Sequence, residues 1–309
     1  MLPAGPQPER RSAPARARAA QPDEARLLAD VGALARFGTR FAGSRQTPAV
    51  LDWLRGRMAE SGLAVEEESF PLRVGLRETV QINLFAQVPG RDPARPGLLL
   101  LAHYDSINEG WAGEKASLAD PETPAPGAGD NGSGVAVLLE TARLLAASAP
   151  ERPVAFLFSA AEEMGQAGSR HYARAEAGRL SGLAWVVNVD QIGRSRSGPL
   201  AMQLFTRDQG IRLAWRLQDI AREACPEILS WRLHLDDRLG KSDHGPFLDA
   251  GLMAASLSEG PGYYPWEAQG AGDAPERLDI RLMSLAVRLL TATARDPDLP
   301  LPAASTPRG

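Results

Sequence analysis

The amino-acid sequence predicts a single α/β domain built on a doubly wound, mostly parallel mixed β-sheet with helices on both faces. Two observations support this fold class. Short apolar runs typical of buried strands occupy residues 98–102, 154–158, 184–189 and 252–257. Helical patterns lie between these runs, at about 134–147, 168–177 and 208–224. Strands that alternate with helices form parallel sheets, because each connecting helix packs back onto the sheet.

Before this alternation, the chain predicts two helices and a half-buried strand. Asp23 can begin a helix whose apolar face consists of Leu27, Leu28, Val31 and Leu34. A second helix repeats the spacing with Val50, Leu51, Leu54 and Met58. Apolar and polar side chains alternate over residues 80–86, so we expect one or two early antiparallel strands. Near the other end, a last helix would carry on one stripe Leu278, Leu282, Leu285 and Leu289.

Composition predicts where the folded domain begins and ends. Residues 1–22 contain five prolines and four arginines but no apolar stretch, so we expect a disordered N-terminal tail. Residues 296–309 are again rich in proline and predict a disordered C-terminal tail. One folded domain is therefore expected over residues 23–295.

Charge, hydropathy and cysteine usage argue against several classes of protein. The net charge of −4 argues against non-specific nucleic-acid binding. No apolar run is long enough to span a bilayer, so we expect no association with membranes. The single cysteine, Cys225, excludes an intramolecular disulfide framework and favours a reducing compartment, which predicts a cytoplasmic location.

Acidic residues and one histidine follow the predicted strands or begin the helices after them. They are His103, Asp105, Asp130, Glu162, Glu163 and Asp190. Because the carboxyl ends of parallel strands meet at one edge of a sheet, we expect these side chains to lie close together. Several carboxylates at one edge would repel one another without a cation. The pattern therefore predicts a metal site with hydrolytic capacity.

The residue types suggest how such a metal site would be divided. A neutral imidazole at His103 is a good zinc ligand, and Asp105, two residues further along an extended segment, can orient its ring. Asp130 lies in a glycine-rich turn at the start of a helix, where its carboxylate can bridge two cations. Asp190 would supply a further hard ligand.

The adjacent residues Glu162 and Glu163 suggest two different roles. Neighbouring side chains in such a segment point to different sides. One glutamate can therefore bind metal while the other takes a proton from the attacking water as a general base.

Together these motifs resemble metallopeptidase family twenty-eight, the co-catalytic di-zinc aminopeptidases, which share their fold with glutaminyl cyclases. The resemblance covers about residues 23–295 and implies a zinc-exopeptidase, phosphorylase/hydrolase-like fold. The motifs that carry it are His103-Tyr-Asp-Ser106, Gly129-Asp-Asn-Gly-Ser-Gly134, Ala161-Glu-Glu-Met-Gly165, Gly168-Ser-Arg-His-Tyr172, Val189-Asp-Gln-Ile-Gly193 and Ser242-Asp-His-Gly-Pro-Phe247.

The resemblance also implies a role for each residue. One zinc ion would be held by His103 and Asp190 and a second by Glu163, with Asp130 bridging the two. Glu162 would be the general base and Asp105 the outer partner of His103. Residues 243 and 244, an Asp-His pair, would support the substrate side rather than bind metal.

The activity implied is that of a zinc aminopeptidase or amidohydrolase. Such an enzyme hydrolyses the N-terminal bond of small peptides or amino-acid amides with a metal-activated water. Two alternatives stay open. One is a glutaminyl-cyclase-like zinc acyltransferase, and the other is a non-catalytic or impaired relative that keeps a partial metal site.

The sequence departs from the family pattern at the last metal ligand. The family has a histidine after the final strand, yet no histidine follows His244. We therefore expect one or two zinc ions per chain, with Glu267, Asp273 or a tyrosine as candidate replacements for the missing ligand. Tyr264, or its neighbour Tyr263, would hydrogen-bond the tetrahedral intermediate. The other two histidines, at positions 171 and 234, are expected to lie outside the site.

Overall fold

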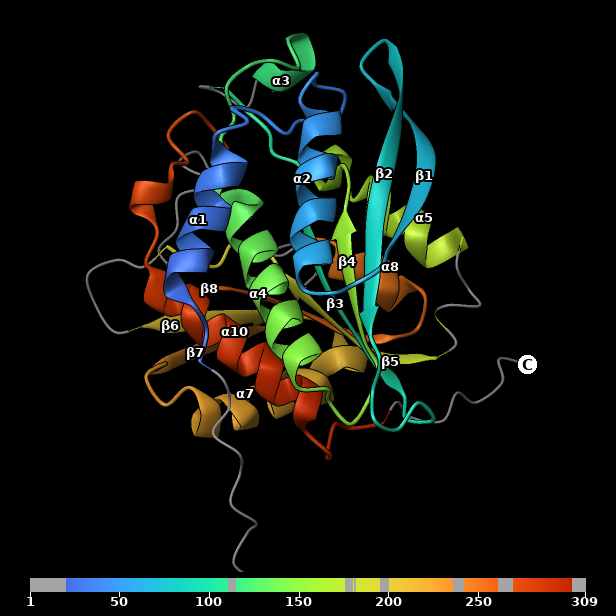
Figure 1. Ribbon diagram of the computed structural model, residues 1–309, viewed down its shortest axis with the longest axis vertical. Coiled ribbons are helices and arrows are strands. Elements are labelled where there is room, and N and C mark those ends of the chain that lie inside the picture. The colour runs from blue at the N-terminus through green and yellow to red at the C-terminus, as the bar shows by residue number, and fades with distance from the viewer. Residues whose placement is uncertain are drawn as a thin grey trace, which may run out of the picture.

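A computed structural model of the chain describes residues 21–110, 115–175, 180, 182–194, 200–235, 242–260 and 269–301. Within these residues, eight strands form one mixed sheet in the order β1-β2-β4-β3-β5-β8-β6-β7 (Figure 1). The strands are β1 Val65–Val74, β2 Arg77–Val88, β3 Gly97–His103, β4 Val154–Ser159, β5 Leu183–Val189, β6 Ala201–Phe205, β7 Ser230–His234 and β8 Met253–Glu259.

The centre of the sheet is parallel, as the alternation of strands and helices predicts. Strand β3 pairs in parallel with β4 and with β5, and β5 pairs in parallel with β8. The antiparallel β1–β2 pair joins this centre through β2 and β4, which confirms the early antiparallel strands. On the other side, β6 runs antiparallel to β8 and parallel to β7. The predicted fold class is therefore correct.

The helices lie on both faces of the sheet and begin close to their predicted positions. The longer ones are α1 Glu24–Ala35, α2 Thr47–Glu60, α4 Ser133–Ala147, α5 Ala167–Ala175, α7 Ile211–Ala224 and α10 Ile280–Arg295. The shorter ones are α3 Ala116–Ala119, α8 His244–Asp249, η1 Ala128–Gly132, η2 Glu162–Met164, η3 Asp208–Gly210 and η4 Pro275–Arg277. Asp23 caps α1 by accepting a hydrogen bond from the backbone N–H of Arg26 at 3.1 Å, as its position predicts.

Each face of the sheet is covered by its own apolar core. Alternate residues of β3 pack into the two cores. Leu98 and Leu100 join the larger core, to which α1, α2, α4, α7 and α10 contribute. Leu99 and Leu101 join the smaller core, with Tyr172 of α5 and Phe247 of α8. Because both faces of β3 are covered, its sequence is apolar without alternation. This double burial fixes the direction in which β3 delivers the residues that follow it.

Truncation of a core residue of β3 should destabilise the whole domain. Leu100 is fully buried, so Leu100→Ala is expected to lower the free energy of unfolding by about 2–5 kcal/mol. Leu76→Ala is the matched control, because Leu76 is 92% exposed in the β1–β2 turn, and it should change stability by less than about 0.5 kcal/mol. Urea unfolding monitored by circular dichroism measures both values. Equal effects of the two substitutions would contradict this account of the core.

The packed chain continues past the predicted end of the domain at residue 295. The carboxylate of Asp296 accepts two hydrogen bonds from Arg216, at 2.8 and 2.6 Å. Leu299 is 5% exposed, and the indole N–H of Trp185 donates to the carbonyl of Pro300 at 2.7 Å. The first part of the expected C-terminal tail is therefore folded, because these polar and apolar contacts outweigh its proline-rich composition. Residues 1–20 and 302–309 lie outside the described residues.

Candidate metal centre

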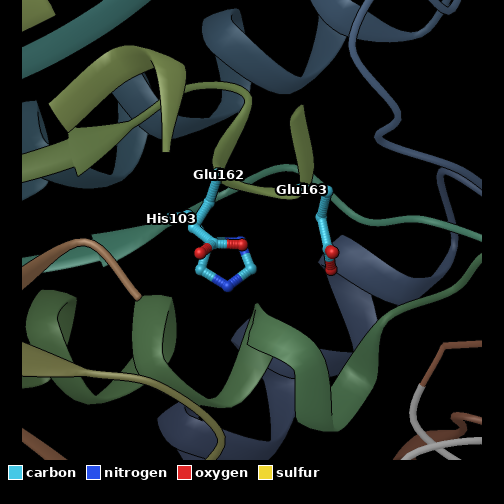
Figure 2. Close-up of side chains that lie close together, drawn as sticks. All are labelled: His103, Glu162 and Glu163. Carbon is cyan, nitrogen blue, oxygen red and sulfur yellow. The ribbon is translucent and has the colours of Figure 1, made fainter. Parts of the chain in front are cut away.

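Neighbouring strands bring the predicted site residues to the carboxyl edge of the sheet. Strand β3 ends at His103, β4 is followed by η2 with Glu162 and Glu163, and β5 is followed by Asp190. Asp130 lies in η1, directly before α4. Figure 2 shows the side chains of Glu162 and Glu163 both directed toward the ring of His103, and one ligand atom of each of the three residues lies within 4.8 Å of the others. The predicted convergence of these residues is present in the structure.

The imidazole of His103 is the centre of the cluster and is 1% exposed. Its Nε2 atom lies 3.2 Å from Asp130 Oδ1 and 3.4 Å from Asp190 Oδ1. One nitrogen of His103 and one oxygen each of Asp130 and Asp190 all lie within 4.8 Å of one another. Three such atoms around one point match the first coordination shell of a divalent cation. His103 forms a second group of this kind with Glu162 and Glu163.

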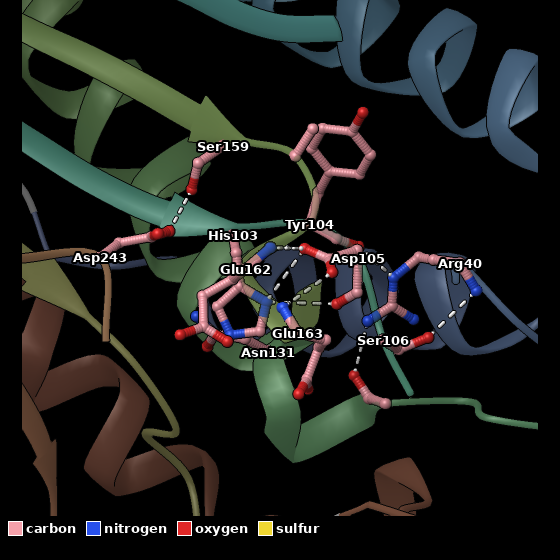
Figure 3. A network of polar contacts seen from close by, with 12 residues as sticks. Arg40, His103, Tyr104, Asp105, Ser106, Asn131, Ser159, Glu162, Glu163 and Asp243 are labelled. Carbon is pink, nitrogen blue, oxygen red and sulfur yellow. Dashed lines mark hydrogen bonds and ion pairs between the residues drawn. The ribbon is translucent and has the colours of Figure 1, made fainter. Parts of the chain in front are cut away.

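Asp105 orients both the imidazole and the two glutamates. Its Oδ1 atom lies 3.5 Å from His103 Nδ1, on the ring nitrogen opposite to the one that faces Asp130. The same carboxylate accepts the backbone N–H of Glu162 at 3.0 Å and that of Glu163 at 3.2 Å (Figure 3). The turn before these glutamates contains Ala161 at φ 54°, a left-handed conformation that costs an alanine about 1–2 kcal/mol. The carboxylate of Asp105 therefore holds a strained turn in place.

Removing the charge of Asp105 should weaken metal binding without removing a ligand. We expect Asp105→Asn to lower zinc affinity by about 10–100-fold, because the outer partner of a ligating histidine fixes its ring and raises its basicity. Competition with a chromogenic chelator measures the affinity. The control is Asp120→Asn, because Asp120 lies exposed just after α3. An unchanged affinity in Asp105→Asn would contradict this role.

Asp273 braces the loop that carries Asp130. Its two carboxylate oxygens accept the backbone N–H groups of Gly129 and Asp130, each at 2.8 Å, and Arg194 also binds it. The side chain is fully buried. Asp273 had been a candidate for the missing metal ligand, and this interpretation is wrong, since both oxygens are already bound to backbone donors. Its distance in sequence from Asp130 concealed this structural role.

Asp243 is also a buried brace. Its carboxylate accepts hydrogen bonds from the hydroxyls of Ser159 and Ser169, and the side chain is fully buried (Figure 3). Burial raises the pKa of Asp243 to about 6. In the structure its oxygens join the end of β4 to α5, and the expectation that Asp243 supports the substrate side stays a prediction. The adjacent Ser242 donates to Asp190 and so holds that carboxylate beside His103.

The electrostatics of the cluster favour a bound positive charge. Burial by itself would lower the pKa of His103, but Asp105, Asp130 and Asp190 together raise it well above its usual value. Burial and neighbouring acids raise the pKa of Glu162 and Glu163 well above the usual range. Such a site attracts a proton or, more strongly, a divalent cation.

Two buried carboxylate oxygens without hydrogen-bond donors indicate that the cluster can hold a cation. Oδ1 of Asp190 and Oε1 of Glu163 are inaccessible to solvent and have no hydrogen-bond partner among the described residues. A buried carboxylate oxygen without a donor is costly unless a cation satisfies it. Imidazole nitrogen and carboxylate oxygen are also both ligand atoms that bind zinc in proteins. The residues present therefore fit a zinc ion.

Several predicted residues lie elsewhere or outside the described chain. Tyr264, its neighbour Tyr263 and Glu267 fall within residues 261–268, which the structure does not describe. His171 stacks on Phe70 with ring centroids 4.9 Å apart, and His234 stacks on Phe205 at 4.5 Å. Both histidines occur outside the metal-ligating groups found among the described residues, as predicted.

Three residues at the site were missed by sequence reasoning. The amide of Gln191 donates to Asp130 Oδ2, and the amide of Gln269 donates to Glu163 Oε2 at 3.2 Å. Arg40 is buried and donates to the carbonyl of Tyr104 (Figure 3). It also donates to the carbonyls of Leu34, Pro126 and Gly127. The position of Gln191 next to Asp190 was a usable signal. Neither Gln269 nor Arg40 has a comparable signal, because their partners are distant in sequence.

The match to a family model decides the family of this chain. Residues 83–292 match the model described as peptidase family M28, which covers more than half of the chain. The chain belongs to peptidase family M28. The resemblance predicted from the motifs is therefore confirmed, and membership indicates a zinc metallopeptidase.

Curated relatives of the M28 chain are named as zinc metalloproteases and aminopeptidases. A probable zinc metalloprotease of Pyrenophora tritici-repentis is 26% identical over 84% of the chain and 70% of its own length. Leupeptin-inactivating enzyme 1 of Streptomyces exfoliatus is 28% identical over 75% of the chain. Aminopeptidase YwaD of Bacillus subtilis is 29% identical over 62% of it. The chain spans only 47% and 38% of these last two proteins.

Solved structures share the fold. A leucine aminopeptidase precursor of Bacteroides thetaiotaomicron superposes with a TM-score of 0.76 at 19% identity, over 90% of this chain and 99% of that one. A glutaminyl cyclase of the same organism gives a TM-score of 0.74, also at 19% identity and with the same coverage of both chains. At these identities, the likeness shows that the M28 chain has the fold of both kinds of enzyme.

Proposed function

We propose that this chain is a zinc-dependent aminopeptidase that hydrolyses the N-terminal bond of small peptides or amino-acid amides. The observation that carries the proposal is the grouping of His103, Asp130 and Asp190 within ligating distance of one another, with Glu162 directed toward the same imidazole. These three residues would hold a zinc ion. When bound, zinc lowers the pKa of a coordinated water and polarises the scissile carbonyl.

The residues of the chain supply the proton transfer and the recognition. Glu162 takes the proton of the attacking water and delivers it to the leaving amine. Burial raises the pKa of its carboxyl, which makes the ionised carboxylate a stronger base toward the attacking water than an ordinary glutamate. Asp105 fixes the backbone of Glu162 and so sets the direction of this transfer. Tyr264 would hydrogen-bond the tetrahedral intermediate.

The acidic character of the site supports recognition of a free amino terminus. Asp130, Glu162, Glu163 and Asp190 lie around His103, and four carboxyl groups can together carry more negative charge than the two positive charges of one divalent ion. A protonated amine is attracted to such a surplus, and a substrate with a blocked N-terminus lacks this attraction. The relatives named as aminopeptidases, YwaD among them, agree with this substrate class.

An assay of the zinc-loaded protein separates the proposed function from its alternatives. We expect release of free amino acid from leucine amide or alanine amide, loss of the activity with a chelator, and no cleavage of the N-acetylated amides. Loss of ammonia from an N-terminal glutamine without hydrolysis would instead identify a glutaminyl cyclase, whose fold this chain shares. A folded, zinc-loaded protein that acts on neither amino-acid amide and not on the N-terminal glutamine would overturn the proposal.

No helix within the described residues is long and apolar enough to cross a membrane. The cytoplasmic location favoured by the single cysteine stays a prediction.

A further inference from the structure

Two glutamine amides contact the carboxylates that a second cation would share. Gln191 donates through Nε2 to Asp130 Oδ2, and Gln269 donates through Nε2 to Glu163 Oε2 at 3.2 Å. Asp130 thus uses its two oxygens differently, because its Oδ1 faces His103 at 3.2 Å. An amide NH2 group is a donor only and cannot bind a cation. In a carboxylate that bridges two cations, each oxygen binds one metal ion. In Asp130 the Oδ2 atom instead accepts a hydrogen bond from the amide of Gln191.

The backbone of Gln191 aims this amide at Asp130. Gln191 adopts φ 60°, a left-handed conformation that is uncommon for a residue other than glycine. Its N–H donates to the side chain of Asn131 at 3.2 Å, and its carbonyl accepts from Glu259 N at 2.8 Å. A strained conformation persists only where its surroundings hold it. The contact with Asp130 is therefore built into the turn after β5.

Gln269 belongs to a short segment, residues 269–273, that also supports Asp130. Its carbonyl accepts from Glu109 N at 3.0 Å, so its backbone is tied to the loop after β3. Four residues later, Asp273 binds the backbone of Gly129 and Asp130. One short segment therefore fixes Asp130 directly and reaches Glu163 through Gln269.

A buried arginine supplies fixed positive charge beside the same carboxylates. Arg40 is 2% exposed, and within the described residues its guanidinium donates its hydrogen bonds to backbone carbonyls. The charge of Arg40 therefore interacts electrostatically with several carboxylates of the site, namely Asp273, Asp105, Asp130 and Glu163. Arginine remains charged at physiological pH, so part of the compensation that a second cation would bring is present in the chain itself.

We propose that the centre holds a single divalent cation, on His103, Asp130 and Asp190, and that Gln191 and Gln269 are positioning residues in the place of a second cation. This inference rests on the proposed function only for the first cation. The chain would then be a mononuclear metallohydrolase, and the single zinc ion, held by these residues, would supply both the acidity of the water and the polarisation of the carbonyl. Glu163 is then held through its Oε2 atom by an amide hydrogen bond and does not bind a second cation.

Metal stoichiometry tests the proposal. The full chain is saturated with zinc, freed of loosely held metal by gel filtration, and assayed by elemental analysis. We expect about one equivalent in the wild type and in Gln269→Ala, and about two in Gln269→His, whose imidazole adds a ligand beside Glu163. Electron paramagnetic resonance of the cobalt-loaded proteins gives a second readout, with spin coupling between two ions expected only in Gln269→His. Circular dichroism verifies that each variant is folded.

The possible outcomes point in different directions. Two equivalents in the wild type that fall to one in Gln269→Ala would make Gln269 a metal ligand and overturn the proposal. One equivalent in a folded Gln269→His would show that the amide does not occupy a cation position, and would overturn it as well. No zinc in the wild type would refute the proposed function itself. Asp190→Asn serves as the control for the first cation and should lose the single equivalent.

Discussion

Glu162→Gln should lower kcat by about 10²–10⁴-fold while the zinc content stays unchanged. Glutamine has nearly the shape of glutamate but cannot accept the proton of the attacking water. The side chain accepts a hydrogen bond from Gln166 at 3.3 Å and is directed toward His103, so the substitution removes a base without opening a cavity. Steady-state hydrolysis of leucine amide and elemental analysis of the same sample provide the two values.

The pH profile adds a second test of Glu162. Burial raises the pKa of its carboxyl above that of an ordinary glutamate. A base must be ionised to act, so wild-type activity should fall as the pH drops through this raised pKa and be full above it. The residual activity of Glu162→Gln should lack this acidic limb. Glu78→Gln is the matched control, because Glu78 is exposed on β2 and should leave both rate and profile unchanged. A Glu162→Gln enzyme with wild-type kcat would exclude Glu162 as the base.

His103→Ala should abolish tight zinc binding and, with it, all hydrolysis. The imidazole is the one residue shared by both ligating groups of the described site. Its loss should weaken zinc affinity by more than the roughly 10–100-fold that follows the loss of an outer partner. Isothermal titration of the metal-free protein with zinc measures the change. His171→Ala is the histidine control, since His171 stacks on Phe70 away from the cluster. Zinc binding of wild-type strength in His103→Ala would refute the metal centre described here.

The sequence alone predicted those parts of the fold that depend on local pattern. The runs that became β3, β4, β5 and β8 are buried on both faces, so they are continuous in apolar residues and easy to recognise. Strands β6 and β7 were not predicted, and β1 was expected only as a second early strand without bounds. Much of β1 is exposed, and β6 and β7 have five residues each, so none of them has the length or burial that makes a pattern visible.

For the candidate site, the sequence predicted which residues converge but not what supports them. His103, Asp130, Glu162, Glu163 and Asp190 are recognisable because each lies at the end of a strand or the start of a helix. Asp273 was misinterpreted as a possible ligand because its partners, Gly129 and Asp130, are 144 and 143 residues away in the sequence. Gln269, which reaches Glu163 over 106 residues, was missed for the same reason.

What the sequence by itself determined is the chemistry at the edge of the sheet, namely one imidazole among several carboxylates, because strand ends place these groups by local pattern. What only the tertiary structure decided is how each carboxylate is occupied. Asp105 is divided between an imidazole and two backbone N–H groups, and Asp130 between His103 and Gln191. Hydrogen bonds have a reach of about 3 Å and depend on direction, so pairings between distant segments exist only once the chain has folded.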